Sequence, residues 1–410
     1  MSRPGPRMTA GSAALAAALL AACSSPGPGP SATPTTLPST TAAPAATTTG
    51  AATSTTRPSC SDQSVIASWP LSKRAAQLVV APVLEADPAA VRVAVSAGAG
   101  GLILIGAVPG PAQLRAALAP VTAASPRPMV MADEEGGAVQ RLEGDVVAIP
   151  SARQMAATMT PAQVQQLAAE VGRQMKALGV GVDLAPVVDL DAGAGPSARD
   201  PDGTRSFSAD PDVASRYAQA FAAGLTAGGV IPVFKHFPGL GGSTGNTDYG
   251  AAPTPPLAQL QHAGLIPFQR AAGAGAQAVM VSNATVPGLT SVPVSLSAAA
   301  VTGLLRDQIH FRGLVLTDSL SAGAIRAAGR SVPAAATAAV SAGADMVLFG
   351  STLTAADRAQ LAPGPLSAEI AAIVGALSGA VRAGTLPEAR LDAAVLDVVR
   401  ARGTRLCPAR

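Results

Sequence analysis

Eight short runs rich in Val, Ile and Leu, separated by longer Ala-rich segments, constrain the fold of this chain more than any other feature. Apolar runs of this length are typical of buried strands, and the segments between them suit helices, so the pattern predicts repeated strand–helix units around a parallel sheet. Eight such units close a TIM barrel, and we therefore expect an α/β fold, a (β/α)8 TIM barrel. The predicted strands are residues 78–83, 101–105, 129–132, 180–186, 231–234, 278–281, 314–317 and 346–349.

Polar residues follow directly after several of these runs. In a barrel the carboxyl ends of all strands lie on one face, where the active site forms. A doubly wound open sheet would use similar strands, but its ligand would lie at one switch point and would not draw on so many strand ends. The closed barrel accounts better for the polar residues that follow the runs, which are Asp133, Asp189, Lys235 with His236, Ser282 with Asn283, and Asp318.

The N-terminal residues have the pattern of an export signal. Arg3 and Arg7 precede an uncharged Ala/Leu-rich run that ends at Cys23. An N-terminal core helix is the alternative, but no polar face recurs at a helical period. We expect residues 1–22 to be a lipoprotein signal peptide that ends in a bacterial lipobox. Lipidation of Cys23 would anchor the protein at the extracytoplasmic face of the cell membrane.

The segment that follows has the composition of a linker. Residues 23–59 are almost wholly Ser, Thr, Pro, Ala and Gly, with Arg57 as their only charge. Such a segment cannot bury enough apolar surface to fold, so we predict a disordered linker that begins with the lipidated cysteine. The folded domain is then residues 60–410, a size common for an α/β barrel.

Cysteines and net charge limit the remaining possibilities. Cys60 and Cys407 stand at the two ends of the folded region, and in an oxidising compartment we expect them to form a disulfide, with two isolated thiols as the alternative. No CxxC pair or His/Cys cluster is present, so we expect no metal and no cofactor. The net charge is only +3 and no Lys/Arg cluster occurs, which argues against a nucleic-acid partner.

Several ordered motifs are similar to those of one enzyme family. They are ADEEGGAVQRL at 132–142, LAPVVD at 184–189, RSF at 205–207, KHFPG at 235–239, FRGLVLTDSL at 311–320 and AGADMVL at 342–348. This set resembles glycoside hydrolase family 3, specifically its single-barrel β-N-acetylglucosaminidase branch. The resemblance implies an exo-acting retaining glycosidase that removes terminal N-acetyl-β-D-hexosamine (GlcNAc) residues, with peptidoglycan fragments as the carbohydrate substrate. A β-glucosidase of the same fold remains an alternative.

The resemblance assigns roles to five residues. Asp318 matches the nucleophile, since an oxocarbenium-like transition state must collapse onto an anion to give a covalent glycosyl-enzyme. Taken alone, an Asp that follows a strand is more often a helix N-cap. Asp133, Arg205, Lys235 and His236 match residues that bind the terminal sugar, because carboxylates and cations form strong hydrogen bonds with hydroxyls. A structural ion pair or a core histidine is the alternative for the last two.

Four other acidic residues near these motifs are expected to have structural or supporting roles. They are Glu134, Glu135, Asp189 and Asp345. Neighbouring residues that leave a strand point in different directions, so Glu134 and Glu135 are not expected to share an environment. The family has Gln at the position of Glu134.

The loop after Lys235 departs from the family pattern. This branch usually has KHFPGHG followed by Asp-Ser-His, whose histidine is the general acid/base, whereas this chain has KHFPGLGGSTGNTDYG. Leu240 replaces the second histidine, and Asp248 stands at the position of the last one. We hypothesise that Asp248, on a Gly-rich loop, acts as the acid/base, with an ordinary turn-forming role as the alternative. A sugar-binding lipoprotein with impaired catalysis is the competing function, but the retained Asp318 favours an enzyme.

Overall fold

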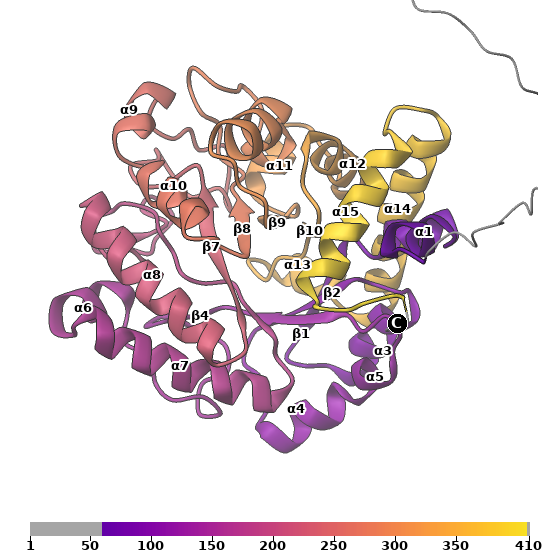
Figure 1. Cartoon of the computed structure of the whole chain (residues 1–410), viewed down its shortest axis with the longest axis horizontal. Coiled ribbons are helices and arrows are strands. Elements are labelled where there is room, and N and C mark those ends of the chain that lie inside the picture. The colour runs from indigo at the N-terminus through magenta and orange to yellow at the C-terminus, as the bar shows by residue number, and fades with distance from the viewer. Residues whose placement is uncertain (1–59, 408–410) are drawn as a thin grey trace, which may run out of the picture. The chain divides into compact units, whose positions relative to one another are not determined.

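A closed sheet of eight parallel strands forms the centre of residues 60–407, the part of the chain that the computed structural model describes (Figure 1). Its ends meet because β10 pairs with β1, while Leu316 of β9 forms a parallel bridge with Met346 just before β10. The (β/α)8 barrel expected from the sequence is therefore confirmed. In sheet order the strands are β10 (Val347–Leu348), β1 (Val79–Leu84), β2 (Gly101–Ile105), β3 (Met129–Ala132), β6 (Val182–Asp183), β7 (Ile231–Phe237), β8 (Ala278–Val281) and β9 (Leu314–Thr317).

Three strands differ from their predicted lengths: β6, β7 and β10, which forms at only two residues of the predicted run 346–349. The run 180–186 forms a strand only at β6, because Pro186 has no N–H to donate to a neighbouring strand. β7 is longer than predicted, because its additional residues find partners on both sides of the strand. Val187 forms a bridge with Lys235, and the last residue of β7 pairs with Val281. Lys235 and His236 therefore belong to the strand itself.

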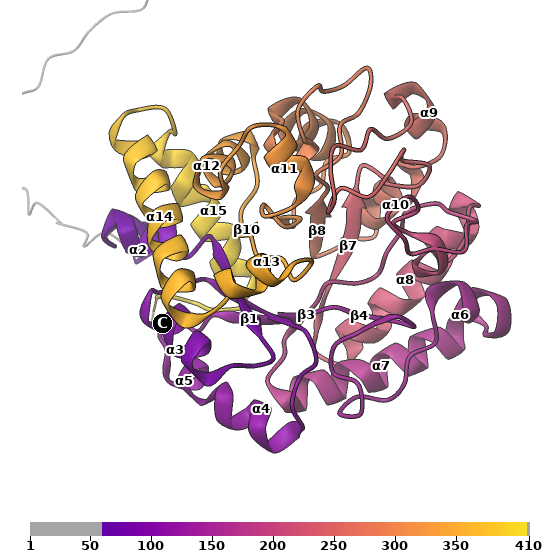
Figure 2. The same ribbon diagram turned by 180° about the vertical axis from the view of Figure 1, so that it is seen from behind.

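Helices surround the barrel (Figures 1 and 2). They connect successive strands on the outside, as a right-handed βα barrel requires. In chain order they are α1 (Asp62–Ala67), α2 (Leu71–Ala76), α3 (Pro88–Ser96), α4 (Pro111–Ala117), α5 (Ala119–Ala123), α6 (Ala152–Thr158), α7 (Pro161–Leu178), α8 (Pro211–Ala227), α9 (Leu257–His262), α10 (Ile266–Gly273), the π-helix η3 (Ala299–Gln308), α11 (Gly323–Ala327), α12 (Val332–Ala342), α13 (Ala355–Gln360), α14 (Pro363–Arg382) and α15 (Glu388–Ala401).

Local sequence explains where α7 begins and ends and how closely it packs. Thr160 caps its first turn, and Gly179 ends it with a φ of +90°, a conformation that glycine adopts without strain. Gly172 and Gly224 lie where α7 and α8 meet. A Cβ atom at Gly224 would come within 2.3 Å of the Gln165 carbonyl oxygen. The two helices therefore approach this closely only because these residues are glycines.

α14 is, among the described helices, the one long and apolar enough to cross a membrane by length and composition. Its buried residues are Leu366, Ile370, Ile373, Leu377 and Ser378, which recur at the spacing of one helical face. That face packs against β1, α2, α3 and α12. α14 is therefore a helix of the barrel wall in this structure.

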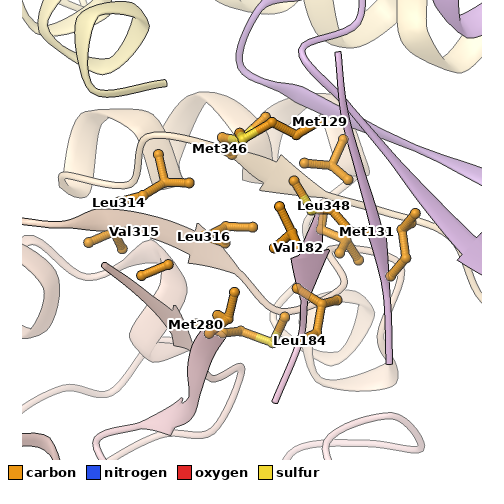
Figure 3. Packing of buried hydrophobic residues seen from close by; sticks show 14 of the residues in the cluster. Met129, Met131, Val182, Leu184, Met280, Leu314, Val315, Leu316, Met346 and Leu348 are labelled. Atoms are coloured by element: carbon orange, nitrogen blue, oxygen red, sulfur yellow. The ribbon is translucent and has the colours of Figure 1, made fainter. Parts of the chain in front are cut away.

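Aliphatic and methionine side chains make up most of the core around the strands (Figure 3). Aromatic residues form only 2% of the chain, and all seven phenylalanines are buried in this core. A packed barrel interior leaves the carboxyl ends of the strands as the place for a site. The labelled core residues are Met129, Met131, Val182, Leu184, Met280, Leu314, Val315, Leu316, Met346 and Leu348.

A disulfide joins the two ends of the described chain. Cys60 and Cys407 are bonded, with their Cα atoms 5.9 Å apart. Asp62 supports this junction, because one of its carboxylate oxygens accepts the N–H groups of Leu406 and Cys407. The expected signal peptide, the linker and the lipidated Cys23 lie outside the described residues.

Candidate active site

A cavity of about 310 Å³ opens at the carboxyl ends of the strands. Its walls combine residues from β7 with residues from the loops that follow β3, β6, β7, β9 and β10. The structure brings to this one cavity all six residues that the sequence singled out for substrate binding and catalysis. They are Asp133, Arg205, Lys235, His236, Asp248 and Asp318.

One wall of the cavity is a chain of alternating charges, which we call the ion-pair wall: Asp133, Lys235, Glu135 and Arg205. The Nζ atom of Lys235 lies 2.6 Å from a carboxylate oxygen of Asp133 and 2.6 Å from one of Glu135. Arg205 binds Glu135 through two nitrogens, at 2.7 and 2.9 Å. Lys235 is only 2% exposed, and its charge is compensated by two carboxylates. The wall is therefore polar, preformed and electrically balanced.

These contacts keep the wall ionised. Burial opposes ionisation of Glu135, but the charges of Arg205 and Lys235 outweigh it and hold the pKa of Glu135 well below its usual value. Burial also opposes the charge on Lys235, yet the adjacent Asp133 and Glu135 raise its pKa. Glu135, which the sequence indicated only as a supporting residue, thus links the two cations of the wall and lines the cavity itself.

A short hairpin sets the directions of the neighbouring glutamates. β4 (Glu134–Gly136) pairs with β5 (Val139–Gln140), and a Cβ atom at Gly136 would lie 2.4 Å from the Pro150 carbonyl oxygen, so the turn requires glycine. Glu134 points away from the cavity and accepts the N–H groups of Arg141 and Leu142. Glu134 and Glu135 therefore lie in different environments, as expected of neighbouring strand residues.

His236 is held by Asp189 behind the cavity. Its Nδ1 atom lies 2.7 Å from one carboxylate oxygen of Asp189, which also accepts the backbone N–H of His236, and the other oxygen accepts the backbone N–H of Leu240. Burial lowers the pKa of His236 to about 4, so the imidazole is neutral near pH 7. A neutral ring that donates from Nδ1 leaves Nε2 as a hydrogen-bond acceptor.

Asp318 lies directly after β9. Its backbone N–H donates to the Val281 carbonyl oxygen, and its carboxylate accepts the Ser319 N–H at 2.7 Å, which fixes the side chain at the strand end. Burial raises the pKa of Asp318, and the nearby Asp248 carboxyl adds to this rise, while His236 opposes it. No Lys or Arg among residues 60–407 forms an ion pair with Asp318.

Asp248 lies in the loop after β7, and its main chain is tied to neighbouring segments. The side-chain oxygen of Asn246 accepts the backbone N–H of Asp248. The backbone carbonyl of Asp248 accepts the N–H of Gly323 at the start of α11. These bonds hold the loop so that the Asp248 side chain lines the cavity. Burial raises the pKa of Asp248. The other histidines, His262 and His310, are exposed and do not line the cavity.

Asp345 has the structural role expected from the sequence. It is fully buried and binds Arg306 and Arg390, each at 2.6 Å. Because it lies away from the cavity lining, its ion pairs support the barrel and not the site.

A cavity at the mouth of a (β/α)8 barrel, lined by two carboxyl groups as well as by a charged polar wall, is the arrangement of a glycoside hydrolase. The comparison with protein families gives the same class. Residues 71–401 match the model of the glycosyl hydrolase family 3 N-terminal domain. The chain belongs to glycosyl hydrolase family 3, and is a glycoside hydrolase.

Similar proteins cover most of the chain. The beta-hexosaminidase LpqI of Mycobacterium tuberculosis is 39% identical over 295 residues, which are 69% of this chain and 70% of that protein. The crystal structure of a glycosyl hydrolase family 3 member from Mycobacterium smegmatis matches with a TM-score of 0.71 and 36% identity, over 83% of this chain and 99% of that one. The beta-N-acetylhexosaminidase from Beutenbergia cavernae matches with a TM-score of 0.71 and 32% identity, over 82% of this chain and 99% of that one.

Proposed function

We propose that this protein is an exo-acting retaining β-N-acetylhexosaminidase that removes terminal non-reducing GlcNAc residues. The observation that carries the proposal is the division of one cavity between the ion-pair wall and two carboxyl groups, Asp318 and Asp248, without cation partners among the described residues. The wall offers hydrogen-bonding groups for sugar hydroxyls, and the carboxyl groups supply the chemistry. The names of the similar proteins support an N-acetylated hexosamine as the sugar.

In the first step Asp318 attacks the anomeric carbon, and the bond to the leaving oxygen breaks. Asp248 gives its proton to that oxygen, so the leaving group departs as an alcohol. In the second step Asp248, now ionised, removes a proton from water, and the hydroxide attacks the anomeric carbon of the glycosyl-enzyme. Asp318 is released as a carboxylate, and the anomeric configuration is retained.

The acid role falls to Asp248 and not to His236. The only proton on neutral His236 is directed at Asp189, so its Nε2 atom can accept a hydrogen bond from a sugar hydroxyl but has no proton to give. Burial shifts the pKa of Asp248 toward neutrality, as a group that must both donate and accept a proton requires.

The cellular setting is part of the proposal. A lipidated Cys23 and a Ser/Thr/Pro/Ala-rich linker would hold the barrel at the extracytoplasmic face of the cell membrane, where peptidoglycan fragments are the nearest GlcNAc-containing substrates. In a membrane fractionation, the wild-type protein should appear with the membranes and the Cys23→Ala variant should not. Unchanged membrane association of the variant would refute the anchor.

The decisive experiment measures release of 4-nitrophenol from 4-nitrophenyl N-acetyl-β-glucosaminide, with Asp318→Ala as the control. We expect turnover by the wild type only, and faster turnover of this compound than of the matching β-glucoside. Absence of release above the Asp318→Ala control would favour the sugar-binding lipoprotein. A preference for the glucoside would favour a β-glucosidase.

A further inference from the structure

Asp202 is a buried acid next to the site that the proposed mechanism does not use. It precedes η1 (Gly203–Arg205), and its side chain has 0% exposure. Neither of its carboxyl oxygens has a hydrogen-bond partner among residues 60–407. An unpaired buried carboxylate is energetically costly, so its charge must be neutralised.

Asp202 lies beside the pair that holds the imidazole of His236. One oxygen of Asp202, one oxygen of Asp189 and one ring nitrogen of His236 all lie within 4.8 Å of one another. The other charged groups that act on Asp202 are Arg205, which favours its ionised form, and Asp191, which opposes it. Two buried carboxyl groups at this separation do not both ionise near neutral pH.

Either a cation or a proton can neutralise this cluster, and the hydrogen bonds favour a proton. Both oxygens of Asp189 already accept N–H groups, from the backbone of His236 and Leu240 and from the imidazole. A metal ion would have to break the 2.7 Å bond between Asp189 and His236 to gain its ligands. The same N–H donors favour the ionised form of Asp189, so the proton resides on Asp202. Burial raises the pKa of both carboxyl groups, but the N–H groups of Leu240 and His236 limit the rise for Asp189 to about 7, whereas Asp202 has no such donors and its pKa is well above its usual value.

We propose that Asp202 is a positioning residue: its protonated carboxyl group interacts with ionised Asp189, directly or through one bound water, and so holds His236 in the Nδ1–H form whose Nε2 accepts a sugar hydroxyl. The inference rests on the proposed function and explains how His236 is kept neutral in the proposed site. When Asp202 loses its proton, two negative charges lie behind the ring, and the balance that fixes the hydrogen bond between His236 and Asp189 is lost.

The inference can be tested without reference to activity, because the chain has only three histidines and the other two are exposed. Nitrogen NMR of protein labelled at histidine reports the tautomer and charge of His236 directly. In the wild type we expect a neutral Nδ1–H ring at pH 6 to 7, and a change in its shifts at higher pH as Asp202 ionises. In Asp202→Asn, whose amide donates a hydrogen bond at every pH, the neutral ring should persist and the alkaline change should be absent.

Kinetics supply the functional readout. On the 4-nitrophenyl substrate, which needs little help from an acid, kcat/KM of the wild type should fall by about tenfold per pH unit above the alkaline change, and that limb should be absent in Asp202→Asn. Asp202→Ser is a second variant in case the first does not fold. An inactive wild type with the expected NMR behaviour would refute the glycosidase and leave the role of Asp202 standing.

Two results would overturn the inference. One is identical pH dependence of the His236 shifts in the wild type and in Asp202→Asn, since a structural carboxyl would leave them unchanged. The other is stoichiometric Zn²⁺ in the purified wild type, by elemental analysis, that is absent from Asp202→Asn. That result would show that a cation and not a proton neutralises the cluster.

Discussion

The acidic residues that line the cavity fall into two groups with opposite shifts in pKa. In the ion-pair wall, Glu135 lies between Lys235 and Arg205, and its pKa is held well below the usual value. Asp318 and Asp248, in contrast, have no cation partner among the described residues, and burial raises the pKa of both. Carboxyl groups that line the same cavity thus differ in how readily they lose a proton.

The difference shows that burial alone does not decide what a carboxyl group can do. Paired with cations, a buried carboxylate remains ionised over a wide pH range and serves recognition. Unpaired, it titrates closer to neutral pH and serves as an acid, a base or a nucleophile. Mutations in the ion-pair wall and mutations of Asp318 or Asp248 should therefore differ in their effects on stability, binding and turnover.

The largest expected effect is the loss of turnover in Asp318→Asn. The amide keeps the volume of the side chain but cannot form the glycosyl-enzyme, so kcat should fall by about 10⁴-fold or more while the fold and weak sugar binding remain. Rates on the aryl substrate and circular dichroism would measure the two quantities. In the wild type, a 2-fluoro sugar should label the peptide containing Asp318, and a label on another carboxylate would overturn the assignment.

The loss of rate in Asp248→Ala should depend on the leaving group of the substrate. Loss of a general acid should slow substrates with poor leaving groups by about 10²- to 10⁴-fold and affect activated aryl glycosides far less. Azide, which needs no deprotonation, should partly restore turnover of the activated substrates. Equal small losses on both substrate types, without an azide effect, would return Asp248 to the role of a turn residue.

Breaking the ion-pair wall should cost stability as well as binding. Lys235→Met leaves the partly buried Asp133 without its cation, so we expect a loss of about 3–5 kcal/mol in the free energy of unfolding and a higher KM. The matched control is Arg270→Met, which breaks an exposed pair with Asp212 and should cost less than about 1 kcal/mol. Similar losses in thermal unfolding of both variants would contradict the difference between buried and exposed pairs.

The smallest effect concerns Glu134, a buried carboxyl outside the cavity. Burial raises its pKa from 4.5 to about 7, so the stabilisation from its protonated form is present at low pH and is lost as the pH rises through about 7. Glu134→Gln cannot lose that stabilisation. It should match the wild type near pH 4 and be more stable by about 2–3 kcal/mol above pH 8. Glu170→Gln, at an exposed helix position, should show no such gain, and a pH-independent difference for Glu134→Gln would contradict the prediction.

The fold could be predicted from the sequence because each strand is marked by a short apolar run and by the polar residues that directly follow it. The lengths of β6 and β7 were wrong, since partners such as Val187 and Val281 come from other parts of the chain. The sequence led to the six cavity residues through the family motifs and the altered loop.

Two acidic residues were missed as parts of the site. Glu135 could have been found only from its position between Lys235 and Arg205, which lie 100 and 70 positions away along the chain. Asp202 stands in the stretch Asp-Pro-Asp-Gly, which is typical of an exposed turn, and nothing local indicates that it is buried beside Asp189. When distant segments of the chain bury a residue, the sequence around that residue does not show it.

The disulfide between Cys60 and Cys407 makes the described chain a nearly closed ring, with Cα atoms 5.9 Å apart where it begins and ends. Because its two ends meet, the chain could begin at a different strand–helix unit without any change in the order of the units around the barrel. A circularly permuted protein, with a short peptide in place of the disulfide and new ends in an exposed loop far from the cavity, would keep every neighbour of every strand. The position of the N-terminus on the barrel could then be chosen freely.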